Sequence, residues 1–121
     1  MSETDLVQAL LVELSGRDAL VYRNNTGMLY ETIPTGQFIG GRPTYFRGRP
    51  VHFGLEGSPD IEGFCRRTGL WIGIEAKARR GVMRAAQLAF AAQAQASPVI
   101  YGVARSVSDA VRILTQRRPG G

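Results

Sequence analysis

Residues 57–77 read GSPDIEGFCRRTGLWIGIEAK, and this segment is the most informative about the fold. Residues 61–65 and 70–77 are predicted to form two paired strands, because the segment between them is polar and ends in Gly69, a turn residue. Side chains alternate along a strand, so Glu75 and Lys77 point to one side. Ile72 and Ile74 point to the other side, which is typical of an inner strand of a sheet.

Two carboxylates in this stretch, Asp60 and Glu75, come together if the strands pair. Hydrolysis of a phosphodiester uses a divalent cation, and carboxylate oxygens are ligands that Mg²⁺ prefers. Lys77 is about 6.5 to 7 Å beyond Glu75 on the same face, by ordinary strand rise. From there it can hold or help deprotonate a water and offset charge on a phosphate. The alternative is a solvated Glu75–Lys77 salt bridge on an edge strand, but an inner strand tolerates such charges only where they serve a site.

On either side of this segment the chain alternates helical and strand patterns. Ser2 caps a helix that Gly16 ends, with apolar residues at helical spacing between them. A strand is predicted over residues 20–23, a turn over 24–27, a helix over 84–96 ended by Ser97-Pro98, a strand over 99–104, and a last helix capped by Ser106. The fold class is therefore α/β, and the tail from Arg117 is predicted to be frayed.

Residues 28–57 are rich in Gly, Pro and aromatic residues. Short apolar pieces are separated by breakers there, so the pattern predicts short strands and long loops. Arg42, Arg47 and Arg49 make the stretch basic.

Composition bounds the class of protein. The chain has 121 residues, 44% of them hydrophobic, which predicts a single domain over residues 1–121. The formal net charge of +5 favours polyanionic partners, nucleic acid first, although a small basic protein can also be merely soluble. Cys65 and His52 are the only cysteine and histidine, so one chain cannot build a disulfide or a Cys/His zinc site. No run is long enough to span a membrane and no signal peptide precedes the domain, so a reducing cytoplasm is expected.

The spacing of these motifs resembles the small stand-alone VRR-NUC proteins of the PD-(D/E)XK nuclease superfamily. The similar elements are Gly57 to Gly63, Ile74-Glu75-Ala76-Lys77, and Gly81 followed by Gln87. The segment from Arg23 to Gly27 is similar to the family's Arg-x-Asn-x-Gly element, and Val103 to Ser106 with Asp109 resembles its closing strand and helix. Arg84 departs from the pattern, since relatives carry Ser or Thr there as a helix cap, which leaves the start of that helix open.

The resemblance implies a restriction-endonuclease-like core, a central mixed sheet flanked by helices. It implies that Asp60 and Glu75 bind the metal, with the carbonyl of Ala76 as a third ligand, and that Lys77 is catalytic. Gln87 would face the site from the following helix, whose inward face it shares with apolar residues. The family also places an acid on the first helix. Glu3 lies on the apolar stripe of that helix and Glu13 less centrally, so Glu3 is favoured, and a surface role for either remains open.

The implied activity is hydrolysis of DNA phosphodiesters with Mg²⁺, for which Mn²⁺ can substitute, on branched DNA such as four-way junctions. The implied source is a phage or mobile element, acting in a bacterial or phage-infected host cell. Candidate DNA contacts are Arg23, Asn25, Arg79, Arg80 and Arg84, the last three equally readable as a solvated basic turn. The rival hypothesis is a non-catalytic DNA-binding module that kept the fold; a complete set of site residues argues against it. Another kind of metal-dependent hydrolase lacks support, because there is no Walker-type phosphate loop.

A homodimer, or a dimer of dimers, is the expected assembly. A domain of this size has a radius of gyration near 14 Å by the usual scaling, too small to present two active centres to a junction. A two-fold pair would match the symmetry of a four-way junction. Tyr30, Phe38, Tyr45 and Phe46 are residue types favoured at interfaces, although each could instead cap the domain's own core.

Overall fold

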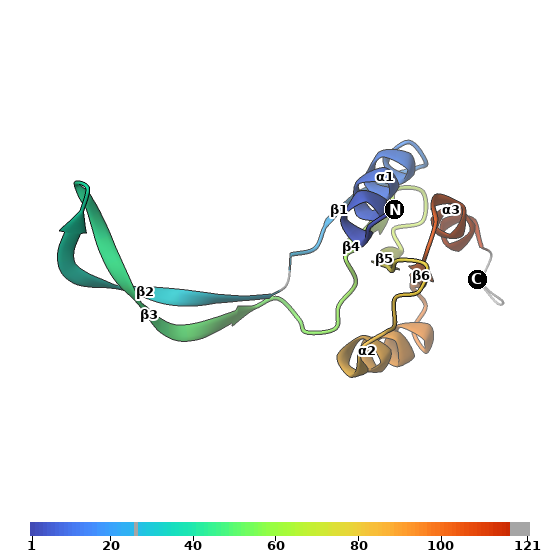
Figure 1. Ribbon diagram of the computed structural model, residues 1–121. Helices are drawn as coiled ribbons and strands as arrows, with labels where there is room; N and C mark the ends of the chain where they lie inside the picture. The colour runs from blue at the N-terminus through green and yellow to red at the C-terminus, as the bar shows by residue number, and fades with distance from the viewer. Residues whose placement is uncertain (26, 117–121) are drawn as a thin grey trace. The chain divides into compact units, whose positions relative to one another are not determined.

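The computed structural model describes residues 1–25 and 27–116, which form three helices and six strands (Figure 1). Contacts divide the chain into two compact units. One contains Met1–Asn25 together with the chain from Glu56 onward, and the other contains Thr26–Leu55. Each unit has its own sheet, the first with four strands and the second with two.

Helix α1, Glu3–Ser15, begins and ends where its sequence predicts. The Ser2 hydroxyl accepts a hydrogen bond from the Asp5 backbone N–H at 3.1 Å, and Gly16 is the C-cap. A capping side chain replaces one of the partners that the first turn of a helix lacks. The inward stripe of α1 is buried and consists of Leu6, Val7, Leu10 and Leu14.

The four-stranded sheet has the order β1-β4-β5-β6, with β1 Ala19–Arg23, β4 Ile61–Cys65, β5 Trp71–Ala76 and β6 Ile100–Ala104. β4 runs antiparallel to both β1 and β5, and β6 runs parallel to β5. The predicted pairing of the two strands in residues 57–77 is therefore confirmed. So is the inner position of β5, since it has β4 on one side and β6 on the other.

Helices cover both faces of this sheet (Figure 1). Helices α1 and α3, Val107–Thr115, pack side by side on one face, and α2, Ala85–Gln95, covers the other. The core against α1 and α3 contains the β5 residues Ile72, Ile74 and Ala76, whereas Trp71 packs with Phe90 and Tyr101 on the α2 side. The predicted α/β class, with a mixed sheet flanked by helices, is confirmed. The alternation along β5 directs Glu75 to the α2 side.

The second unit corrects the prediction of short strands and long loops. It is one long antiparallel hairpin, β2 Gly27–Ile39 and β3 Arg42–Phe53, with Gly40 and Gly41 both at positive φ in the turn. Two left-handed residues make the turn type that suits the twist of a hairpin. In a two-stranded ribbon both strands are edges, so a proline can occupy a position whose missing N–H would face solvent. Pro34, Pro43 and Pro50 therefore lie within strands and do not end them.

Two further predictions concern residues that the structure does not describe. The frayed tail from Arg117 lies outside the described residues, as does Thr26 in the predicted turn; Gly27 already belongs to β2. Among the described residues, no helix is long and apolar enough to cross a membrane.

Candidate active site

The site lies where β4 begins and β5 ends. Ile61 pairs with Ile74 in the antiparallel register, so Asp60 and Glu75 form the next pair along the two strands. The Asp60 carboxylate accepts a hydrogen bond from the Ala76 backbone N–H at 2.9 Å through Oδ2. This bond holds the Asp60 side chain against the end of β5, beside Glu75.

Glu75 is the most constrained charged group of the site. Its side chain is only 2% exposed, and Oε1 accepts a hydrogen bond from Gln87 Nε2 at 3.0 Å. Oε2 is the one buried side-chain oxygen or nitrogen in the described chain that has no hydrogen-bond partner. Burial, and next the negative charge of Asp60, raise the pKa of Glu75 to about 8, whereas the charge of Lys77 opposes the shift.

Lys77 is buried directly after the end of β5, with 6% of its surface exposed. Its backbone N–H donates to the Ala104 carbonyl at 3.0 Å, which continues the pairing with β6 past the last residue of the strand. The positive charge of Lys77 lowers the pKa of Glu75. The structure thus brings together Asp60, Glu75 and Lys77, as their spacing predicts.

Gln87 joins helix α2 to the site. Its Oε1 accepts the Arg84 backbone N–H at 2.9 Å, while its Nε2 donates to Glu75. Arg84 is the N-cap, and a guanidinium has no acceptor atom with which to cap the helix itself. Gln87 therefore supplies half of a capping box from inside the helix, and this bond fixes which end of its amide faces Glu75. The helix start that Arg84 left open is settled at Ala85.

The two candidate acids of α1 have different surroundings. Glu3 remains exposed, but its Oε1 accepts a hydrogen bond of 3.4 Å from the Ala78 backbone N–H. Its negative charge contributes to the raised pKa of Glu75. Glu13 forms an ion pair at 2.8 Å with Arg17, just beyond the C-terminal end of α1. Of the two, the structure places Glu3 at the site and Glu13 in a surface pair.

Two residues outside the predicted set of site residues hold the loops of the site. Asn24 Nδ2 donates to Ser58 Oγ at 2.8 Å and to the Pro59 carbonyl at 3.0 Å, and the Asn24 backbone N–H donates to the Asp60 carbonyl at 2.7 Å. The segment from Arg23 to Gly27 carried a sequence signal, but it pointed to the neighbouring Asn25, which is exposed. Asn24 thus anchors the turn that delivers Asp60.

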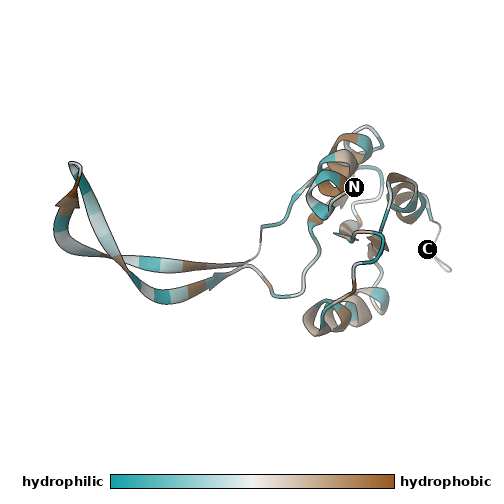
Figure 2. Ribbon diagram, viewed as in Figure 1, coloured by the Kyte–Doolittle hydropathy of each residue, from teal (hydrophilic) through white to brown (hydrophobic). Residues whose placement is uncertain are grey.

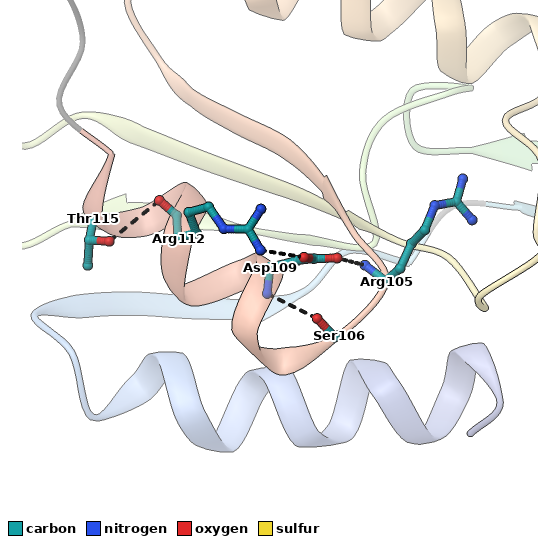
Figure 3. A network of polar contacts seen from close by, with 5 residues as sticks. All are labelled: Arg105, Ser106, Asp109, Arg112 and Thr115. Atoms are coloured by element: carbon teal, nitrogen blue, oxygen red, sulfur yellow. Dashed lines mark hydrogen bonds and ion pairs between the residues drawn. The ribbon is translucent and has the colours of Figure 1, made fainter.

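Arg105 is the second such residue. Its guanidinium Nη1 donates to the carbonyls of Ala78 at 2.8 Å and Gly81 at 2.7 Å, in the loop that follows Lys77. Its backbone N–H donates to the Asp109 carboxylate, which also forms an ion pair with Arg112, and the Asp109 backbone N–H donates to the capping hydroxyl of Ser106 (Figure 3). The Arg105 side chain extends away from α3 (Figure 3). The Arg105 N–H and the Arg112 charge lower the pKa of Asp109. No sequence signal marks this contact, because it joins residues more than twenty positions apart.

Gly57 allows the Asp60 turn to approach α2. Its φ is +83°, and a Cβ built on it would lie 2.2 Å from the Ala86 carbonyl oxygen. Only glycine tolerates both the conformation and the approach. The turn that carries Asp60 and the helix turn that carries Gln87 are therefore in direct backbone contact.

The predicted DNA contacts gather at this end of the sheet. Arg79 and Arg80 follow Lys77 in the chain and are exposed, and Arg84 is exposed at the start of α2. Arg23 is exposed at the end of β1 and pairs in register with Ile61, next to Asp60, with Asn25 two residues further on. The exposed basic residues thus surround the strand ends that hold the carboxylates.

The residues present fit a hard divalent cation. The unpaired Oε2 of Glu75 and its raised pKa both mark a buried carboxylate that a cation would stabilise. In the described part of the chain, no three His, Cys, Asp or Glu side chains are grouped to hold a metal. Two carboxylates with a backbone carbonyl and waters are, however, a set that suits Mg²⁺. Asp60, Glu75 and the carbonyl of Ala76 can supply the protein's part of it.

Comparison with known proteins adds no family. The chain matches no protein-family model, and a search of curated proteins finds no similar sequence.

Proposed function

We propose that the chain is a Mg²⁺-dependent endonuclease of the PD-(D/E)XK type that hydrolyses DNA phosphodiester bonds. One observation carries the proposal: Asp60, Glu75, Lys77 and Gln87 converge at the end of an inner strand, where Glu75 is buried with one oxygen unpaired. A buried carboxyl group with an unpaired oxygen and a strongly raised pKa is costly, and proteins retain such groups mainly at functional sites. A solvated surface pair would not have this burial.

Each residue has a part in the proposed reaction. Asp60 and Glu75, with the carbonyl of Ala76, would hold the cation. A bound Mg²⁺ or Mn²⁺ supplies Lewis acidity and offsets charge that develops on the phosphate. Lys77 holds the attacking water by hydrogen bonding and neutralises charge on the scissile phosphate. Gln87 orients the Glu75 carboxylate through Nε2.

The substrate class follows from charge and from the resemblance to VRR-NUC proteins. The exposed residues Arg23, Arg79, Arg80 and Arg84 lie around the carboxylates, where they would contact phosphates flanking the scissile one. The net charge of +5 favours the same polyanion. Branched DNA, four-way junctions included, is the substrate that the resemblance implies.

A cleavage assay on labelled four-way, flapped and linear DNAs, with and without Mg²⁺ or Mn²⁺, tests the proposal. We expect metal-dependent cleavage that is lost in Asp60→Asn, Glu75→Gln and Lys77→Ala, while circular dichroism and DNA binding persist. These substitutions alter charge at the metal and leave packing intact. Metal-dependent cleavage by purified Lys77→Ala would refute the assignment. Tight DNA binding without cleavage of any substrate would favour the non-catalytic module.

A further inference from the structure

The two faces of the β2–β3 hairpin differ in their chemistry. The Arg47 guanidinium lies 3.4 Å from the centre of the Tyr30 ring, so these two side chains share one face. Glu31 and Arg49 form an ion pair at 3.2 Å on the other face. Cross-strand partners lie on the same side of a ribbon, and neighbours along a strand alternate. The register then places two more rings on the side of Tyr30, and we call these four residues the aromatic face: Tyr30, Phe38, Tyr45 and Arg47.

Each ring of the aromatic face lies opposite a proline of the other strand. The pairs are Tyr30 with Pro50, Tyr45 with Pro34, and Phe38 with Pro43. A proline has no rotamer freedom to lose, so it is a rigid neighbour for a ring. The rings are nonetheless open to solvent, with Tyr30 37% exposed, Tyr45 53% and Phe38 67%. Figure 2 shows hydrophilic and hydrophobic segments alternating along the two strands. A group of exposed rings on one face marks an interaction surface.

The charges of the hairpin favour a polyanion as the ligand of this face. Glu31 is the only acidic residue in the sequence of the second unit, and it pairs with Arg49 on the opposite face. Among the described residues, no carboxylate pairs with Arg47. The flat face of its guanidinium stacks on Tyr30, which orders the side chain and leaves the N–H groups at its edge directed outward. Arg47 is therefore a preordered, uncompensated cation beside the two remaining rings, Phe38 and Tyr45.

Exposed rings beside a basic residue suit nucleic acid whose bases are unpaired. Proteins that bind single strands stack the bases on aromatic side chains and neutralise the phosphates with basic ones. In a duplex the flat faces of the bases are covered by the neighbouring base pairs, and proteins read the base edges through hydrogen bonds. Phe38 has no hydrogen-bonding group, so its exposed ring can contribute to binding only through a flat or apolar partner. In DNA, flat partners become accessible where bases are unpaired.

We propose that the aromatic face of the hairpin binds unpaired bases of DNA, which stack on Phe38 and Tyr45 while Arg47 contacts a neighbouring phosphate. The choice of DNA rests on the proposed nuclease function, and the inference deepens that function by naming the feature of the substrate that the hairpin recognises. DNA with an unpaired segment should gain affinity from this face, whereas fully paired DNA should not. The contact requires no metal, so it can be measured without cleavage.

Fluorescence anisotropy of the full chain in a chelator tests this with two labelled probes, an oligothymidylate of about 20 nucleotides and a blunt duplex of the same length. Phe38→Ala removes a ring from the aromatic face, and Phe46→Ala removes the same ring from the opposite face at a similar exposure, 67% against 64%. We expect Phe38→Ala to weaken single-strand binding at least about fivefold and duplex binding little. Phe46→Ala should change neither. Equal effects of the two variants, an equal loss on both probes, or no binding of the single strand by the wild type would overturn the proposal.

Further variants separate stacking from folding of the hairpin and from net charge. Phe38→Trp keeps a flat ring and should retain single-strand affinity, whereas Phe38→Leu keeps only an apolar side chain and should lose affinity as Phe38→Ala does. Arg47→Gln should reduce the salt slope of single-strand binding more than Arg42→Gln, which removes the same charge from the opposite face. Full affinity in Phe38→Leu, or equal slopes in the two arginine variants, would refute the aromatic face.

The binding and cleavage assays fail independently. If the wild type cleaves DNA with Mg²⁺ but Phe38→Ala binds the single strand normally, this inference is wrong and the nuclease assignment holds. If the variants behave as expected but the wild type cleaves no DNA, the nuclease assignment is wrong and the binding surface holds.

Discussion

Gln87 Nε2 donates a hydrogen bond of 3.0 Å to Glu75 Oε1, and both side chains are at least 95% buried. The same amide accepts the N–H of Arg84 at 2.9 Å, so one side chain both caps α2 and orients the acid. The start of the helix and the geometry of the site are thereby coupled. Loss of this amide should affect stability and activity together.

We expect Gln87→Ala to lower the free energy of unfolding by about 1 to 3 kcal/mol, because it leaves a buried carboxylate oxygen and a backbone N–H without partners. Cleavage should fall as well, since Glu75 is no longer oriented. Urea denaturation and the cleavage rate measure the two effects. Gln93→Ala is the control, because Gln93 is exposed on the same helix. Equal stabilities of the two variants would contradict a coupling through Gln87.

The metal-free protein should lose stability as the pH rises. Burial raises the pKa of Glu75 from its ordinary value of 4.5 to about 8, so between these values the folded chain retains a proton that the unfolded chain has released. The contribution of this proton to the free energy of unfolding is complete below pH 4.5 and is lost as the pH rises through 8. The free energy of unfolding should fall by up to ~1.4 kcal/mol per pH unit in this range. Urea denaturation between pH 5 and 8.5 in the presence of a chelator measures it.

Two controls accompany the pH series. Glu75→Gln should flatten the slope, because the amide does not titrate. Mg²⁺ should stabilise the wild type more at pH 8 than at pH 5.5, because it binds the ionised carboxylate. Identical pH slopes for the wild type and Glu75→Gln would show that Glu75 does not titrate in this range.

Gly57 and Gly69 form a matched pair for testing the contact between the Asp60 turn and α2. Both have positive φ, +83° and +78°. A Cβ at Gly57 would lie 2.2 Å from the Ala86 carbonyl oxygen, whereas a Cβ at Gly69 would have no neighbouring atom within 4 Å. Gly69→Ala should cost only the backbone strain, about 1 to 2 kcal/mol. Gly57→Ala should cost clearly more and also reduce cleavage. Equal losses by urea denaturation would mean that the close approach is absent.

Arg79 and Arg80 are expected to contact DNA phosphates beside the site. Arg79→Gln/Arg80→Gln should weaken binding to all sequences and reduce the salt slope of log K, by up to about two phosphate contacts. The matched control, Arg66→Gln/Arg67→Gln, removes the same charge from the turn between β4 and β5, at the end of these two strands that is opposite the site. Fluorescence anisotropy across a salt series compares the DNA affinities of the two double variants. If the salt slope is unchanged in Arg79→Gln/Arg80→Gln, these residues make no phosphate contacts. If it changes equally in both double variants, the effect is one of net charge and not of position.

Arg105 is expected to keep the loop after Lys77 in place. Arg105→Ala removes the donor to the Ala78 and Gly81 carbonyls, so backbone amides in residues 78–84 should exchange hydrogen faster. Arg105→Lys should recover part of the protection, because an ammonium can reach fewer carbonyls at once. Arg112→Ala, which loses a surface ion pair with Asp109, should leave exchange in this loop unchanged. Slow exchange in Arg105→Ala would show that the loop is held by other contacts.

Elements whose signals are local can be predicted from the amino-acid sequence alone. Ser2 and Ser106 accept hydrogen bonds from N–H groups three residues on, so both helix starts can be read from a few residues. The alternation along residues 71–77 likewise placed Glu75 and Lys77 together, because strand geometry fixes which neighbours share a face. Capping and alternation act over distances shorter than a helical turn or two. No knowledge of the rest of the chain is needed to predict them.

Contacts between residues far apart in the chain, by contrast, depend on tertiary packing. Glu3 lies beside Ala78 and Glu13 does not, and Asn24 rather than Asn25 anchors Ser58, contacts that span 75 and 34 positions of the chain. The long hairpin was missed for a related reason. Prolines disrupt a strand only where their missing N–H should pair, and that depends on whether a third strand lies beside them. Such contacts depend on how helices and sheet pack, which spacing along the sequence does not specify.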